Sequence, residues 1–267
     1  MKNTYHYSLG RIRSLEAHLL TDQQISRMSK AADFESAFSV LSETPYAEIL
    51  PRLKNPFDFE ELYQLEMIAL EELLLKLSFN NPIIKALFAK KDYQASEKHP
   101  FKVDREYFLT LKKACATSQS PLIKNFIKHK IDSVNLKSLL RCQSINRLKL
   151  ALIAGGLLDK DILSSLFGKT AQDMIAKLSY SPYFPEIKKG FEVFEQNNSP
   201  HLLEKLMDNF MIQKFKKAKY LSLGLEPLVG FYLAKQIELK TIRFVLICKK
   251  NSVANKEIGE RVRVSYA

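Results

Sequence analysis

A short segment that occurs twice constrains this chain more than any other feature. Residues 41–46 read LSETPY and residues 178–183 read LSYSPY, so four of the six positions are identical and a fifth pairs Thr with Ser. Before each copy, apolar side chains recur at i, i+3, i+4 and i+7, which is one face of a helix. These side chains are Phe34, Ala37, Phe38 and Leu41 in the first copy, and Ala171, Met174, Ile175 and Leu178 in the second. The pattern predicts that one helical unit is built more than once.

A second element of the repeat occurs three times. Residues 12–15 (IRSL), 136–139 (LKSL) and 239–242 (LKTI) all read apolar, basic, Ser or Thr, apolar. Because each copy opens a unit in chain order, the repeat predicts three helical units, with boundaries at 1–100, 101–200 and 201–267. The third unit is expected to stop early and to pack with the N-terminal helix.

The rest of the chain also favours helices. It has only 8 Gly and 10 Pro in 267 residues, and no stretch shows sustained strand alternation. Long helices are predicted at 58–77, 201–218 and 227–249, the first opened by a variant capping box between Asp58 and Glu61. Residues 90–100 are predicted to be a polar loop, residues 121–131 and 135–152 separate helices, and residues 241–248 and 261–266 somewhat β-prone. The fold class predicted is all-α.

Positive charge is concentrated in two parts of the chain. Residues 101–150 carry 11 basic and 3 acidic side chains, and residues 201–267 carry 13 and 6, within a net charge of +12. Such a field favours acidic partners, which include a protein surface, anionic lipid headgroups and nucleic acid.

The sequence matches none of the catalytic or metal-binding motifs that we considered. Gly168-Lys169-Thr170 imitates the end of a phosphate-binding loop, but Leu163 stands where that loop requires glycine, so a helix start is predicted. The 5 His and 3 Cys residues are scattered without metal-ligand spacing. We therefore predict no enzyme activity, no cofactor and no metal. No signal peptide or membrane-spanning stretch is recognised, which predicts a soluble protein.

Six stretches, taken together and in order, resemble the C-subunit family of V/A-type rotary ATPases and ATP synthases, whose eukaryotic V-ATPase member is called the d subunit. They follow one another in order along nearly the whole chain and are residues 10–17 (GRIRSLEA), 41–50 (LSETPYAEIL), 131–132 with 135–141 (ID, NLKSLLR), 155–158 (GGLL), 226–235 and 238–243 (ELKTIR). Each motif is modest by itself, and their joint order is what carries the resemblance.

The resemblance implies a funnel of three similar helical domains in a pseudo-threefold arrangement on the cytoplasmic face of the membrane. It implies a non-catalytic rotor subunit of the central stalk, peripheral on that face, that transmits torque for ion transport. Its partners would be the central-axle subunits (D and F type), the proteolipid c-ring and the membrane surface, with the ATP sites on other subunits. One departure is that the first domain lacks the Asp-x-x-Asn-Leu-Lys helix usual in the family and holds only Lys91-Asp92-Tyr93 before residue 100, so this domain is expected to be shortened.

Basic residues that recur at matching places in the units are the candidate interface with acidic groups of the axle or ring. They are Arg11, Arg13, Lys137, Arg141, Lys240 and Arg243. An alternative is that they are solvated or pair within the chain. For the whole protein, two other classes stay open, a basic helical nucleic-acid binder and a generic helical scaffold, although nucleic acid is not the partner that we predict.

Overall fold

The computed structural model describes residues 5–96, 99–219 and 224–267, and every regular element within them is a helix. The predicted all-α class is therefore confirmed. The chain divides into two compact units, unit 1 with residues 1–80 and 212–267, and unit 2 with residues 81–211. The funnel of three domains is not confirmed by this division and stays a prediction.

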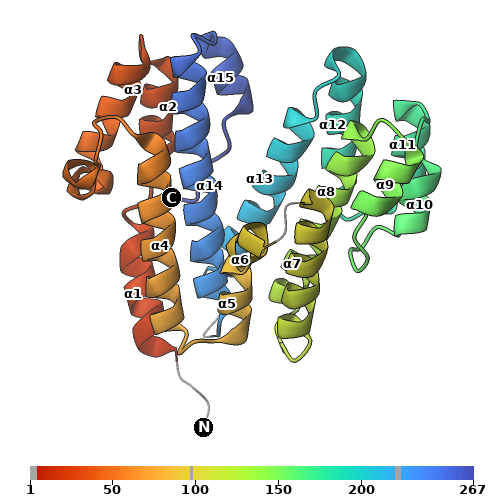
Figure 1. The fold of residues 1–267 in the computed structure, drawn as a ribbon, viewed down its shortest axis with the longest axis horizontal. Helices are drawn as coiled ribbons and strands as arrows, with labels where there is room; N and C mark the ends of the chain where they lie inside the picture. The colour runs from red at the N-terminus through yellow and green to blue at the C-terminus, as the bar shows by residue number, and fades with distance from the viewer. Residues whose placement is uncertain (1–4, 97–98, 220–223) are drawn as a thin grey trace. The chain divides into compact units, whose positions relative to one another are not determined.

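Unit 1 is assembled from both ends of the chain around one long helix. Its elements are α1 (His6–Glu16), α2 (Asp22–Lys30), α3 (Phe34–Ser39), the 3-10 turns η1 (Val40–Glu43), η2 (Pro45–Glu48) and η3 (Leu50–Arg52), α4 (Phe59–Leu77), the end of α13 (His201–Ala218), α14 (Glu226–Lys250) and α15 (Asn255–Arg261). Helix α14 packs against α1, α2, α3 and α4, and Figure 1 shows α4 running beside it. One core therefore joins residues about 200 positions apart in sequence, such as Leu41 and Val245.

Local hydrogen bonds explain where the helices of unit 1 begin. Thr21 forms a complete capping box with Gln24, and the Asp33 carboxylate accepts a bond from the Ser36 N–H. Asp58 likewise caps α4, as predicted. The capping box would also require the Glu61 side chain to accept a hydrogen bond from the Asp58 N–H. That part of the prediction is wrong, because the Glu61 carboxylate accepts from the Lys54 N–H at 2.8 Å instead.

Unit 2 contains a second, more local core. Its elements are α5 (Pro82–Phe88), α6 (Lys90–Ser96), α7 (Pro100–Cys115), α8 (Pro121–Arg141), α9 (Ile145–Ala151), α10 (Lys160–Ser165), α11 (Ala171–Lys177), α12 (Phe184–Asn197) and the start of α13. Helix α8 packs against α7, α9 and α10, and these are neighbours in Figure 1. Leu136, Leu178, Ile187 and Phe191 are fully buried at its centre.

Three local predictions are wrong, and packing explains each difference. Residues 90–96 form α6 instead of a polar loop, because α6 packs on α7 and the Tyr93 hydroxyl meets Thr110 Oγ1 at 2.7 Å. The predicted break after residue 131 is absent, since the polar side chains of Asp132 and Asn135 bond to a neighbouring loop and leave α8 continuous. The β-prone residues 241–248 lie inside α14, where burial in the core outweighs their propensity.

Candidate functional site

Two of the candidate basic residues in unit 1 pair with the chain's own acids. Arg13 Nη1 lies 2.7 Å from Glu16 Oε2, and Glu16 is buried. On α14, Arg243 Nε lies 2.8 Å from both carboxylate oxygens of Glu60 on α4. The Arg243–Glu60 pair is exposed, so a partner could compete for either residue.

The other four candidates are accessible. Arg11 on α1 and Lys240 on α14 are exposed, and Lys137 on α8 is half-buried. Arg141, at the end of α8, is exposed and lies 2.9 Å from Glu204 on α13. Lys137 and Arg141 belong to unit 2, and the other four candidates belong to unit 1.

The most ordered polar contacts in unit 1 converge on a buried carboxylate in the middle of α14. Glu238 accepts hydrogen bonds from the Leu20 N–H, at the turn before α2, and from the Tyr46 hydroxyl at 2.6 Å. Lys235, one turn earlier, lies 3.2 Å from Glu238 and 2.9 Å from Glu66 on α4. We call Glu238 the bridging carboxylate of unit 1. It connects α14 to the segment that runs from the start of α2 to η2.

Unit 2 repeats this connection with a different residue. Asp132, fully buried on α8, accepts from the Leu157 N–H at 2.7 Å, from the Leu158 N–H at 3.1 Å and from the Tyr183 hydroxyl. Desolvation raises the pKa of this carboxyl to about 6, although its hydrogen bonds act in the opposite direction. Among the residues that the structure describes, no cation forms an ion pair with Asp132. Asp132 is the bridging carboxylate of unit 2.

The two bridging carboxylates define how the sequence repeat is used. In each unit a long helix supplies an acid that binds the second leucine N–H of a Leu-Leu pair and the tyrosine of the Pro-Tyr motif. Tyr46 and Tyr183 are both buried, and the helix faces before them are buried except for Phe34 and Ile175, which are partly buried. The long helix follows the repeat in unit 1 and precedes it in unit 2, so the order along the chain is reversed.

A double glycine lets the loop of unit 2 reach its carboxylate. A Cβ on Gly156 would stand 1.9 Å from Asp132 Oδ1, so no other residue fits there without displacing the loop. One turn along α8, the amide of Asn135 donates to the Ile153 carbonyl and accepts from its N–H, both at 2.8 Å. Residues 153–158 are therefore held on α8 by two side chains.

A buried histidine lies beside Asp132. His129 Nε2 lies 2.9 Å from the Met207 carbonyl on α13, and its ring contacts those of Tyr183 and Phe210 at centroid distances of 5.2 and 5.5 Å. Desolvation lowers the pKa of His129 to about 4, which keeps the imidazole neutral near pH 7. Its Nδ1 is buried with no hydrogen-bond partner.

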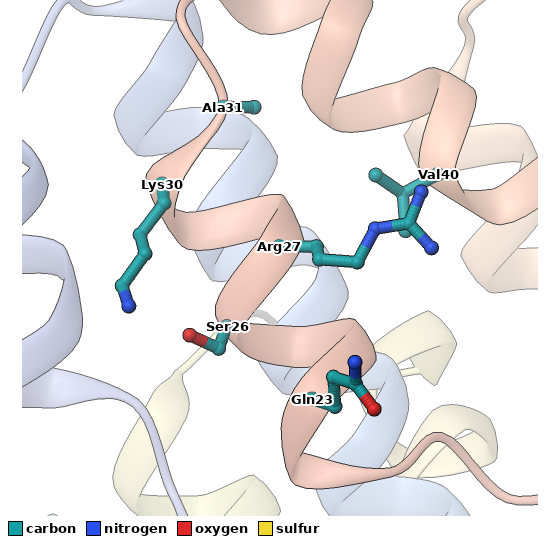
Figure 2. Close-up of a pocket in the computed structure, with 6 residues that line it drawn as sticks. All are labelled: Gln23, Ser26, Arg27, Lys30, Ala31 and Val40. Carbon is teal, nitrogen blue, oxygen red and sulfur yellow. The ribbon is translucent and has the colours of Figure 1, made fainter.

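An open hollow of about 500 Å³ lies on the outer side of α2. Figure 2 shows Arg27 reaching toward Val40, while Lys30 and Ser26 point the other way. The guanidinium already makes two bonds to Glu43, at 2.6 and 2.8 Å. Because its charge is matched within the chain, this hollow carries no assignment as a ligand site.

Three other features bear on chemistry. Thr170 caps α11 through the Asp173 N–H, as the helix-start interpretation of residues 168–170 predicts. Within residues 5–96, 99–219 and 224–267, no three or more His, Cys, Asp or Glu side chains are grouped so that they could hold a metal ion. Within the same ranges, each helix is too short or too polar to cross a bilayer.

The class that the fold and site define is an all-helical protein of two units, each with an apolar core and a buried bridging carboxylate. The family follows from comparison with known proteins. The model of the ATP synthase (C/AC39) subunit family matches residues 9–95 and 100–261, so the chain belongs to that family. The resemblance found in the sequence is confirmed.

Named relatives agree with this membership. The C subunit of the A-type ATP synthase of Pyrococcus horikoshii is 19% identical over 97% of this chain and 90% of its own length, and that of Methanocaldococcus jannaschii is 20% identical over 95% and 85%. The C subunit of the V-type sodium ATPase of Enterococcus hirae is 25% identical over 51% of this chain and 42% of its own length. The first comparison extends over 333 positions against 267 residues here, so that relative has stretches without a counterpart in this chain.

Reasoning from sequence missed the roles of both bridging carboxylates. Asp132 and Glu238 lie within the stretches that carry the resemblance, yet neither received a role. A partial signal was present, because each acid directly follows an isoleucine inside a long helix, and an acid that is buried with such a neighbour is costly unless it is paired. The sequence could not indicate that each one meets the repeated tyrosine.

Proposed function

We propose that this protein is the non-catalytic central-stalk rotor subunit of a V/A-type rotary ATPase or ATP synthase. It would form the socket between the axle subunits (D and F type) and the proteolipid c-ring, peripheral on the cytoplasmic face of the membrane. It would transmit torque for ion transport, with the ATP sites on other subunits. Membership of the ATP synthase (C/AC39) subunit family, over nearly the whole chain, carries this proposal.

The internal construction of the protein supports a mechanical role. A connector that transmits torque needs stiff elements whose relative positions are fixed by more than apolar contact. Helices α8 and α14 are 21 and 25 residues long, and each is tied through one buried carboxylate to a separate helical segment of its unit. Removing one donor of such a buried contact costs about 1–3 kcal/mol, so these connections oppose displacement of the segment along the helix.

The six basic residues are the proposed contacts with acidic groups of the axle or ring. Arg11 and Lys240 are exposed, and the exposed pair of Arg243 with Glu60 could exchange its acid for one on a partner at little cost. Arg141 could likewise exchange its ion pair with Glu204 for one with an acid of a partner.

Purification from native membranes in mild detergent tests the function directly. The tagged chain is expected to bring down proteolipid ring and axle subunits in fixed ratio, identified by mass spectrometry. A chain that elutes without them from membranes that contain an active ATPase contradicts the proposal.

Charge reversal tests the interface separately. Replacing Lys137, Arg141 and Arg243 by Glu should weaken assembly at least tenfold at low ionic strength, with the difference shrinking as salt is raised. The matched control is Glu60→Gln with Glu204→Gln, which frees Arg243 and Arg141 and should leave assembly equal or stronger. Equal loss in both variants would mean that the arginines act only through their intramolecular pairs.

A further inference from the structure

An extended segment covers the Leu-Leu turn of unit 1. Residues 262–267, which we call the strap, follow α15 without regular structure. The Ser265 N–H donates to Asp22 at 2.8 Å and the Ser265 hydroxyl donates to the Leu20 carbonyl. Leu19 is only 5% exposed, and it lines one small cavity together with residues 264–266. The strap therefore buries the turn whose N–H binds Glu238.

The equivalent turn of unit 2 is more exposed. The shared contacts to the bridging carboxylates match Leu20 with Leu158, and hence Leu19 with Leu157. Leu157 is 39% exposed where Leu19 is 5% exposed. The repeat also matches Glu43, which is paired with Arg27, to Tyr180, whose ring is 55% exposed. Unit 2 thus exposes a leucine where the strap covers its counterpart in unit 1, and an aromatic ring where unit 1 has an exposed ion pair.

Cations border this exposed surface. Lys112 Nζ lies 3.0 Å from the Ala154 carbonyl, over Gly155, and is exposed. Lys128 is exposed one turn before Asp132 on α8 and acts on its carboxyl electrostatically. Two acids, the buried Asp132 and the exposed Asp159, also act electrostatically on Tyr180, whose hydroxyl lies against the Asp159 backbone. We call Leu157, Tyr180, Lys112 and Lys128 the Leu157 patch.

We propose that the Leu157 patch binds an extended, acidic segment of a partner protein, seated on unit 2 as the strap is seated on unit 1. The segment would place an apolar or aromatic side chain on Leu157 and Tyr180, a hydroxyl on the Leu158 carbonyl, and carboxylates near Lys112 and Lys128. The chain's own strap does not suit this position, because Arg263 within it and Arg261 just before it would meet these lysines.

This proposal does not rest on the rotor assignment, since the intact chain alone can be tested. Two synthetic peptides serve as probes, and both contain the Val-Ser-Tyr sequence of residues 264–266. One peptide has two glutamates on each side of this sequence, and the other has two lysines on each side. Binding is followed by fluorescence anisotropy with the intact chain at low ionic strength. The glutamate-flanked peptide is expected to bind at least tenfold more tightly than the lysine-flanked one.

Variants decide where the peptide binds. Leu157→Asp, Tyr180→Ser and Lys112→Glu should each weaken binding at least tenfold, while Leu150→Asp, at a 56% exposed leucine elsewhere in unit 2, should leave it unchanged. Circular dichroism on each variant shows whether the fold is retained, and two exposed positions besides Leu157 keep the test decisive if one variant unfolds.

Three results would overturn the proposal. They are equal affinity for both peptides, no binding at millimolar concentration, and binding that Leu157→Asp and Tyr180→Ser leave intact. The last result would mean that the peptide displaces the strap from unit 1, which Ser265→Ala should then enhance.

Discussion

The two units make the same connection with different electrostatics. In unit 1 the bridging carboxylate Glu238 has a cation beside it, because Lys235 lies 3.2 Å away. In unit 2 Asp132 is held by two backbone N–H groups and the hydroxyl of Tyr183, and burial raises its pKa to about 6. The comparison teaches that the repeat preserves the geometry of the contact, a long helix tied to a tyrosine and a turn, and leaves each unit its own way to balance the charge.

Breaking the charge balance of unit 1 should have the largest effect. Lys235→Met leaves the buried Glu238 and the partly buried Glu66 without their shared cation, which should cost about 3–5 kcal/mol in the unfolding free energy of unit 1. Denaturant titration, with hydrogen exchange to follow α14 and α8 separately, measures this loss. The same substitution at exposed Lys76 on α4 should change stability by less than about 0.5 kcal/mol. A loss in the Lys235 variant no larger than in this control would refute the charge-balance account.

His129 and Asp132 should make the stability of unit 2 depend on pH in opposite directions. Because the folded pKa of His129 is lowered to about 4, the unfolded state binds its proton more tightly, and acidification from about pH 6.5 to 4 removes stability. Asp132 has the opposite sign, since a raised folded pKa adds stability as pH falls from about 6 to 4. The two contributions, each on the order of 3 kcal/mol from about two pKa units, therefore nearly cancel in unit 2.

His129→Gln should expose the contribution of Asp132. Relative to the unmodified protein, unit 2 of this variant should gain about 3 kcal/mol between pH 6.5 and 4, measured by denaturant titration at several pH values with hydrogen exchange of α8. The control is His18→Gln on exposed His18 in unit 1, which should leave the pH profile of unit 2 flat relative to the unmodified protein. An equally flat difference for His129→Gln would contradict the opposed contributions.

The smallest effects should come from the paired tyrosines. Tyr183→Phe removes one of three donors to a carboxylate that has no cation, and should cost about 2 kcal/mol. Tyr46→Phe removes the same donor from Glu238, which keeps Lys235, and should cost about 1 kcal/mol. Each variant is the control for the other in thermal unfolding of the intact chain, and a larger loss for Tyr46→Phe would reverse the proposed difference.

Periodicity predicted the helices and their buried faces well. Ala37, Leu41, Met174 and Leu178, which the repeat placed on one helix face, are all buried. These features depend on residues three or four apart, which the sequence displays directly. The sequence did not predict helix α6, because this polar segment of seven residues has no apolar face with helical spacing. Its helical structure depends on its contacts with α7.

The candidate site was less accessible from sequence. The basic residues were found by their recurrence, but recurrence could not indicate that Arg243 pairs with Glu60 or Arg141 with Glu204. Such pairs join helices far apart along the chain, and a lysine or arginine on a helix surface can reach many acids. Whether they also meet a partner stays a prediction.

The sequence by itself determined the helical class, most helix starts and the repeated Pro-Tyr motif, because caps and amphipathic faces are local. Only the tertiary structure decided which long helix supplies the bridging carboxylate of each unit. Glu238 reaches Leu20 across 218 residues, whereas Asp132 reaches Leu158 across 26. No local pattern distinguishes these pairings, since they follow from which apolar faces pack together and from the need of a buried acid for hydrogen-bond donors.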